Sequence, residues 1–408
     1  MLWRKTSTYY HIQPLHLYKS IHKQMKRLAI IASHPIDYNA ALFKTLTERE
    51  KVILKVFYTW SQFKHVTLFD MEYRRRNPRK SPFLEDYDYT FVNNTAPEPG
   101  LHHFDGIENP TLIADIEEWN PTAILVFEWS FKSHLDCLHH FHNKIPVLYR
   151  EETTLFTEKF INKDRLKGIN LASVYASIDK ALYLGTYNKE YYESYGLIEN
   201  KLISAPFAIE NERFFDISYN YETSADAWRA RYNIPVSSMV FLYAGKLITS
   251  KGVELLIDAF KSISSPKKHL MIVGNGPLED DLKKRSAGFA NIHFLDFEEP
   301  QMMHLVYRLC DVYVLPCIEP GETWGYSVNE AMACSKAVLV SNKACGATDI
   351  IQPGANGYIF NTDKEGDLKD KMSKFNDVLE TYMMGEKSLY FVKYYSLKNL
   401  AIAVEQEV

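Results

Sequence analysis

PCIEPGETWGYSVNEAMAC, residues 316–334, is the stretch around which the second half of the chain is organised. The apolar run DVYVLP that leads into it predicts a buried strand. The loop that follows carries Glu322, and a helix is predicted to begin near Gly325 or Tyr326 with Glu330 about one turn in. Unpaired backbone N–H groups at a helix start attract an anion, and a carboxylate just inside the helix can accept hydrogen bonds from a ribose diol. The alternative interpretation is an ordinary capped helix with two solvated acids. We favour the binding site, because other parts of the chain supply the further residues that such a site needs.

Size and composition limit what the chain can be. It has 408 residues, 46% of them hydrophobic, and a formal net charge of −4. This length suits two or three domains, and the charge does not indicate a general nucleic-acid surface, so we expect no nucleic-acid partner. The longest apolar runs are strand-sized and too short to span a bilayer. Five scattered cysteines without metal-site spacing fit a reducing cytoplasm, where we expect the protein to be.

Apolar strand-sized runs alternate with helical patterns from Arg27 onward. This alternation is typical of doubly wound parallel sheets, and it predicts two Rossmann-like α/β domains that face a central cleft. The first domain is expected at 25–205 and the second at 237–385. A polar stretch, 206–236, is interpreted as the linker between them. The last segment, 386–408, is predicted to be a crossover helix that packs back on the first domain.

Two basic segments lie outside this alternation. Residues 1–24 carry four lysines or arginines before the first acid of the chain. We expect them to be a disordered extension outside the fold, and the alternative is a basic arm that touches anionic lipid. The run RRRNPRK at 74–80 can meet a phosphate or a membrane surface, or it can simply be a solvated face.

Two loops of the second domain have residues suited to phosphate. AGKLITSKG, 244–252, places Lys246 just past a strand and Lys251 before a helix, so two ammonium groups can converge on a diphosphate. GNGP holds Gly274 and Gly276 between a strand and a helix, where glycines allow close approach of the backbone to a ligand. Each motif alone is also explained as an ordinary solvated turn.

Taken together, these motifs resemble the donor-binding domain of glycosyltransferase family 4, whose members are retaining enzymes of the GT-B fold. The resemblance covers residues 239–361 and rests on the GK…SKG loop, VGNGP, the Glu, seven residues, Glu pattern, and NGYIF. It implies that Glu330 holds the nucleotide ribose and that Glu322 lies beside the donor sugar. It also implies that backbone N–H groups of Trp324, Gly325 and Tyr326 bind the diphosphate.

The same resemblance implies roles for the two lysines and the glycine turn. Lys246 and Lys251 would neutralise the leaving phosphates, and the turn with Gly274 and Gly276 would contact the donor. Lys246 stands where the family more often has Arg, so the charge is kept but the bidentate fork is lost.

The first domain offers several candidates for a catalytic residue. Many family members carry a His at a strand end near the reacting sugar, and the comparable strand end here is Glu128-Trp129-Ser130. Glu128 is therefore one candidate, with His102 or His103 from the preceding loop and His34 from the first strand–helix loop as others. A capping or surface role is an equal alternative for each of them.

A metal site is not expected. Asp86-Tyr87-Asp88 spells the DxD pattern that binds a divalent ion in the other glycosyltransferase fold, but it lies in an irregular segment of the wrong domain. The resemblance makes a metal unnecessary, because lysines and a helix N-terminus supply the positive field. We expect no cofactor beyond a nucleotide-sugar donor.

The resemblance therefore implies a retaining glycosyltransferase. The donor would be UDP-, GDP- or dTDP-linked, and the acceptor a glycan or lipid-linked sugar in bacterial surface polysaccharide assembly, with peripheral contact at the inner membrane face. The alternatives are a sugar-nucleotide epimerase, a phosphorylase, for which no pyridoxal phosphate lysine signature is found, and a non-catalytic nucleotide-binding subunit.

Overall fold

The computed structural model describes residues 25–65, 69–70, 75–76, 84–158, 169–215, 220–319 and 321–408. The basic extension at 1–24 lies outside the described residues, as does most of the basic run at 74–80. A two-residue antiparallel pair, β3 (Phe69–Asp70) with β4 (Arg75–Arg76), is all that is described within the irregular segment between 66 and 83.

The first half of the chain forms a seven-stranded parallel sheet in the order β5-β2-β1-β6-β7-β8-β9. Its strands are short apolar runs with both faces covered by helices, which is why they read as nearly continuous hydrophobic sequence. Helices α1 and α14 pack on one face and α2 to α5 on the other. The bounds are β1 (Arg27–Ala32), α1 (Asp37–Glu48), β2 (Ile53–Tyr58), β5 (Tyr89–Phe91), α2 (Leu112–Trp119), β6 (Ala123–Phe127), α3 (Lys132–Phe141), β7 (Val147–Arg150), α4 (Leu171–Ala176), β8 (Lys180–Tyr183), α5 (Thr186–Ser194) and β9 (Leu202–Ser204).

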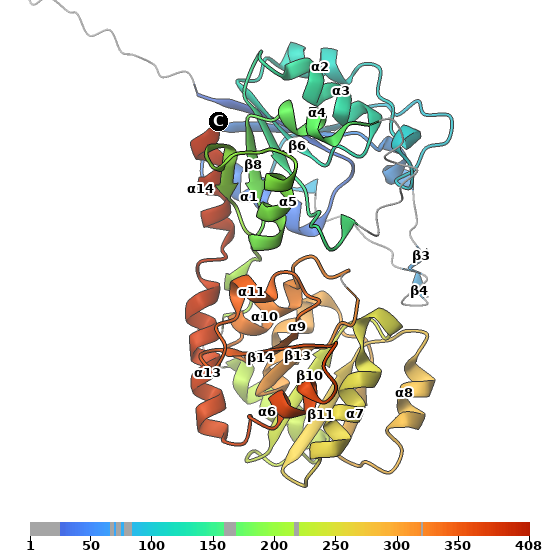
Figure 1. The fold of residues 1–408 in the computed structure, drawn as a ribbon, viewed down its shortest axis with the longest axis vertical. Coiled ribbons are helices and arrows are strands. Elements are labelled where there is room, and N and C mark those ends of the chain that lie inside the picture. Colours follow the sequence, from blue (N-terminus) through green and yellow to red (C-terminus); the bar gives the residue numbers. More distant parts are fainter. Residues whose placement is uncertain are drawn as a thin grey trace, which may run out of the picture.

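The second half forms a six-stranded parallel sheet in the order β12-β11-β10-β13-β14-β15. Figure 1 shows the two domains stacked along the long axis of the molecule. One face of this sheet is covered by α6, α9, α10 and α11, and the other by α7, α8 and α12. The bounds are β10 (Met239–Ala244), α7 (Val253–Ile263), β11 (Lys268–Val273), α8 (Glu279–Arg285), β12 (Ile292–Leu295), α9 (Met303–Val306), β13 (Val312–Leu315), α10 (Tyr326–Ala333), β14 (Ala337–Ser341), α11 (Ala347–Ile350), β15 (Gly357–Phe360) and α12 (Asp367–Met372).

The predicted linker region contains a helix of its own. Helix α6 (Asn220–Arg231) places Ala225 in the core of the second domain and contacts α9. The polar composition of this stretch is explained by its solvent-facing side, since most α6 side chains are exposed or half-buried.

The chain returns to the first domain at its C-terminal end. Helix α13 (Val378–Val392) packs on α10 and β14, whereas α14 (Leu397–Glu407) packs on α1. Figure 1 shows these two helices in red along one edge of both domains. The predicted packing of the C-terminal helix on the first domain is confirmed, although two helices form where one was expected. Ser396 caps α14, as its side chain accepts a hydrogen bond from the backbone N–H of Asn399 at 3.3 Å.

Two helix starts differ from the sequence pattern. Asn109-Pro110 suggests the start of α2, but the helix begins at Leu112, because the Asn109 side chain is buried and donates to the backbone carbonyl of Thr59 at 2.8 Å. Helix α5 begins at Thr186, and a residue of the second domain caps it. The backbone N–H and hydroxyl of Thr186 both donate to the Asp349 carboxylate of the second domain, at 3.1 and 2.7 Å.

Candidate functional site

A cavity of about 1200 Å³ lies between the two domains at the carboxyl ends of the second sheet. Loops after β10, β11 and β13 line it, which is where parallel α/β sheets bind ligands. The predicted site residues that line it are Lys246, Lys251, Gly274, Glu322, Tyr326 and Glu330. The first domain contributes the start of α1 and the segment after β9 to the opposite wall.

Helix α10 begins at this cavity because of Gly325. This residue precedes the helix with φ 94°, a left-handed conformation that favours glycine. A Cβ at Gly325 would also lie 3.2 Å from Leu315 and 3.3 Å from Val328. The turn therefore places the start of α10, with its first backbone N–H groups, at the cavity wall that Tyr326 and Ser327 line.

Lys251 and Glu322, which the sequence places 71 residues apart, form an ion pair. The pair depends on Gly252, which has φ 66° and packs against the loop after β13. A Cβ at Gly252 would lie 2.1 Å from the backbone oxygen of Pro316. The close contact of the two loops is thus what places the predicted phosphate-binding lysine beside the predicted sugar-binding glutamate.

Lys246 and the glycine turn are packed together in a similar way. The backbone oxygen of Lys246 accepts a hydrogen bond from the Tyr243 hydroxyl at 2.6 Å, which fixes the loop after β10. A Cβ at Gly274 would lie 2.0 Å from the Gly245 oxygen, and one at Gly276 would lie 2.4 Å from the Leu247 oxygen. Gly274 lines the cavity, whereas Gly276 holds the turn against the neighbouring loop without lining it.

Glu330 lies half-buried at one end of the cavity. The Tyr307 hydroxyl donates to its carboxylate at 2.6 Å. Burial raises the pKa of Glu330 to about 7, opposed by the Tyr307 hydrogen bond and by the charge of Arg213. Both partners were missed by sequence reasoning, because Arg213 comes from the segment after β9 and Tyr307 from the turn after α9.

Trp324 and Tyr326 have different positions on the same loop. The Trp324 side chain is 1% exposed, and its indole N–H donates to Asn329 at 3.1 Å, so it anchors the loop to α10 rather than lining the cavity. The Tyr326 ring stacks on Tyr38 of the first domain with ring centroids 3.6 Å apart, and Phe207 packs edge-on to it at 4.7 Å. Aromatic rings from α1 and from the segment after β9 therefore flank the start of α10.

None of the predicted first-domain candidates lines the large cavity. Glu128 follows β6 with φ 62°, and its backbone oxygen accepts a hydrogen bond from His134 at 2.9 Å. Glu128 and His34 line a small crevice of about 40 Å³. His102 and His103, both described, line neither the large cavity nor this crevice. A non-glycine residue in the left-handed region is strained, and such residues often occur at functional sites.

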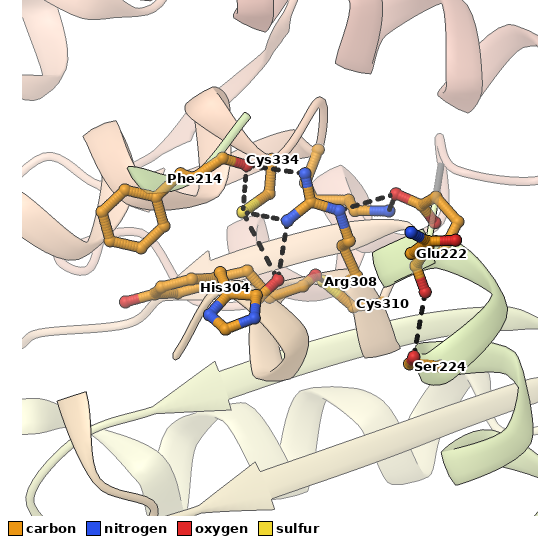
Figure 2. Close-up of polar contacts among 10 residues, drawn as sticks. Phe214, Glu222, Ser224, His304, Arg308, Cys310 and Cys334 are labelled. Atoms are coloured by element: carbon orange, nitrogen blue, oxygen red, sulfur yellow. Dashed lines mark hydrogen bonds and ion pairs between the residues drawn. The ribbon is translucent and has the colours of Figure 1, made fainter. Parts of the chain in front are cut away.

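A cluster around Arg308 holds the back of the site together (Figure 2). Its guanidinium donates to the backbone oxygens of Phe214 at 2.6 Å and His304 at 2.7 Å, and to the Cys334 sulfur at 3.2 Å. Glu222 of α6 pairs with it at 3.1 Å. Arg308 thus ties the segment after β9 to the second domain, directly behind Tyr307 and Glu330. Burial raises the pKa of the Cys334 thiol to about 12, which makes it an inert packing residue.

Asp86, the first acid of the DxD pattern, is paired with Lys44 of α1 at 2.6 Å and lines the large cavity. Within the described part of the chain, no group of three or more His, Cys, Asp or Glu side chains could hold a metal ion. Of the helices described, none is long and apolar enough to cross a membrane.

Residues 224–383 match the family model described as glycosyl transferases group 1. The chain is 28% identical over 231 residues to the lipopolysaccharide 1,2-N-acetylglucosaminetransferase of Salmonella typhimurium. The matched region covers 52% of this chain and 58% of that protein. The chain is 30% identical over 141 residues to a sulfoquinovosyl transferase of Arabidopsis thaliana, covering 34% and 26%. The chain therefore spans only part of the length of these curated relatives.

Among solved structures, HepE of Anabaena in complex with UDP superposes with a TM-score of 0.69 at 14% identity, covering 94% of this chain and 99% of HepE. A glycosyltransferase of Rickettsia africae superposes with a TM-score of 0.67 at 15% identity, covering 94% and 97%. These similarities confirm the predicted fold, in which two parallel-sheet α/β domains are arranged as in GT-B glycosyltransferases.

Proposed function

We propose that the chain transfers a sugar from a nucleotide-sugar donor to an acceptor hydroxyl with retention of configuration, and the match of residues 224–383 to the glycosyl transferases group 1 model supports this. One observation carries the proposal. A single cavity brings together Glu322, Glu330, Lys246, Lys251 and a helix start from loops that are far apart in the sequence. This is the set of groups that a nucleoside diphosphate sugar requires.

The donor is expected to lie along the cavity from Glu330 to Glu322. The ionised Glu330 carboxylate accepts hydrogen bonds from the ribose hydroxyls, and the start of α10 holds the diphosphate with Lys246 and Lys251. Glu322 then lies beside the sugar. Before the donor binds, the Lys251–Glu322 ion pair keeps both charges compensated. The incoming diphosphate takes over Lys251, and Glu322 becomes available for sugar hydroxyls.

In the proposed reaction the acceptor oxygen bonds to the anomeric carbon, and the bond from that carbon to the diphosphate breaks with its electron pair. The acceptor proton passes to a phosphate oxygen on the same face of the sugar, which leads to retention without a protein nucleophile. Lys246 and Lys251 stabilise the negative charge that develops on the leaving group.

The donor and acceptor classes are proposed from relatives. The UDP complex of HepE supports a uridine nucleotide, and GDP- and dTDP-linked sugars belong to the same test. The Salmonella relative, a lipopolysaccharide transferase, supports a glycan acceptor in bacterial surface polysaccharide assembly. A lipid-linked acceptor and peripheral contact with the inner face of the membrane belong to the same proposal. No metal or further cofactor has a role in the proposed reaction.

A binding and turnover panel tests the proposal. Purified protein is heated with UDP-, GDP- and dTDP-linked sugars, and at least one of them should raise the unfolding temperature, since a bound ligand stabilises the folded state. Release of the nucleoside diphosphate is then measured with the same donor. Glu330→Ala should weaken nucleotide binding, and Glu322→Ala should slow turnover more than it weakens binding. Wild-type protein that neither binds nor turns over any of these donors would contradict the proposal. A donor recovered as its epimer would point to a sugar-nucleotide epimerase instead.

A further inference from the structure

The small crevice of the first domain contains an unusual pair of groups. Arg150, at the end of β7, is 3% exposed and donates through Nη1 to the backbone oxygen of Ala205 at 2.5 Å. Its guanidinium also packs on the Phe207 ring, with 5.1 Å from Cζ to the ring centroid. The Nη2 of Arg150 has no hydrogen-bond partner among the described residues, although it is buried. Buried donors are nearly always paired, so this nitrogen points to a missing partner.

Glu152 stands at the same crevice, two residues further along the chain. Its carboxylate accepts a hydrogen bond from the Thr323 hydroxyl of the second domain at 3.1 Å. Thr323 is the neighbour of Glu322 in the sequence, so the crevice lies next to the end of the large cavity where the donor sugar is proposed. The surrounding protein and the charge of Glu128 raise the pKa of Glu152 to about 7, although part of its side chain is exposed to solvent.

A free guanidinium N–H beside a carboxylate is complementary to sugar hydroxyls, each of which both donates and accepts a hydrogen bond. The crevice also has Glu128 and Glu151 on its wall, so three carboxylates lie around the Arg150 guanidinium. A phosphate group would meet repulsion from these acids, whereas an uncharged hydroxyl would not.

We propose that this crevice is the acceptor subsite, in which Glu152 accepts a hydrogen bond from the attacking hydroxyl and Arg150 donates to a neighbouring hydroxyl of an uncharged sugar. The inference rests on the proposed function and extends it to the acceptor. The atoms balance as in that reaction, since the hydroxyl oxygen bonds to the anomeric carbon and its proton leaves on the diphosphate. Glu152 orients the hydroxyl before the reaction and exchanges its bond to Thr323 for this one. As the oxygen bonds to the anomeric carbon, the single hydroxyl proton turns from Glu152 to the phosphate oxygen.

The test uses water as the acceptor, because hydrolysis of the donor needs no knowledge of the natural acceptor. Glu152→Gln keeps the size of the side chain and its ability to accept from Thr323 but removes the charge. At saturating donor, we expect this variant to hydrolyse the donor at least tenfold more slowly than wild type, with the Kd for the free nucleotide within twofold of wild type. An unchanged hydrolysis rate would overturn the inference.

Thr323→Val is the matched control, because it removes the same interdomain hydrogen bond from the other side. If Glu152 acts on the acceptor, Thr323→Val should lose less than threefold. Equal losses in the two variants would mean that Glu152 only joins the domains, and the inference would be wrong. Wild-type protein without donor binding or turnover is a different result, since it contradicts the proposed function itself.

The preference for an uncharged acceptor is tested with a mixed pool of methyl glycosides and their 6-phosphates, followed by mass analysis of the products. Transfer to a neutral glycoside supports the subsite, and transfer to a phosphorylated sugar would overturn it. If the pool gives neither product, the ratio of the hydrolysis rates of wild type and Glu152→Gln decides.

Discussion

The Glu330 carboxyl group is held between two opposing effects. Removal from water favours its neutral form, while the Tyr307 hydroxyl and the charge of Arg213 favour the carboxylate. The result is a group with a pKa of about 7, which can change its charge in the neutral range. A nucleotide ribose needs the carboxylate form as its hydrogen-bond acceptor. Binding of the donor should therefore shift Glu330 from a mixture of both forms towards the carboxylate.

This raised pKa makes stability depend on pH. Between the ordinary pKa of about 4.5 and the folded value of about 7, the folded protein holds a proton on Glu330 that the unfolded chain has released. The free energy of unfolding therefore falls as the pH rises through that window. Glu330→Gln removes this titrating group. The unfolding free energy of the variant minus that of wild type should therefore rise by ~1–2 kcal/mol from pH 5 to pH 8, a range that allows for solvent screening of a half-buried group.

Thermal or denaturant unfolding of both proteins at pH 5 and pH 8 measures this difference. Glu151 and Glu152 also have raised pKa values, so wild type and variant will both lose stability with pH. Only the difference between them reports on Glu330. Parallel curves over the whole range would mean that the Glu330 pKa is ordinary.

At the scale of elements, the site is built by loops that touch backbone to backbone. Gly252 brings the loop after β10 against the loop after β13, and Gly274 packs the turn after β11 on the same side. These contacts are too close for any side chain, and they set the distance between groups from different loops. The glycine content of these motifs therefore reflects the packing of loops on each other as much as any contact with a ligand.

Gly252→Ala should test this role directly. The variant places a Cβ 2.1 Å from the Pro316 oxygen in addition to imposing a left-handed backbone on alanine. We expect a loss of roughly 3 kcal/mol in unfolding free energy, and separation of Lys251 from Glu322 should weaken donor binding.

Gly288→Ala is the matched control, since Gly288 has φ 87° but nothing within 4 Å of the position of its Cβ. It should lose only about 1 kcal/mol, the cost of the backbone conformation alone. Equal losses in the two variants would show that the loop contact contributes nothing.

At the scale of the whole molecule, the first domain is completed by the last helix of the chain. Leu400, Ala401 and Val404 of α14 are buried in the same core as α1 and the first sheet. Arg49 of α1 pairs with Glu405 of α14 at 2.7 Å. The first domain thus consists of two pieces of sequence, with the second domain between them.

Val404→Asp should destabilise the first domain by roughly 3 kcal/mol, because it buries a carboxylate among apolar side chains. Gln406→Asp adds the same charge two residues away, where the side chain is exposed, and should change stability by less than about 0.5 kcal/mol. Unfolding curves of the two variants provide the comparison. Similar midpoints would mean that α14 is not part of the core.

The sequence predicts what short-range patterns encode. Apolar runs predict the strands of both sheets, and the spacing of Glu322 and Glu330 predicts the loop and helix that carry them. Tyr38, Tyr307, Arg213 and Glu152 could not be predicted, because each is defined by a partner from another part of the chain. The Glu152–Thr323 hydrogen bond, for example, joins residues 171 positions apart in different domains. The start of α5 also depends on such a partner, since the Asp349 carboxylate caps it from the other domain.

The position of α14 also has a consequence for the synthesis of the protein. The ribosome delivers the strands of the first sheet early, but the helix that seals one face of it emerges only after the whole second domain has been made. Until then, the part of the first-domain core that Leu400, Ala401 and Val404 fill stays open. The nascent chain must therefore carry an unfinished first domain through most of translation, and during that interval it is most exposed to chaperones and to aggregation.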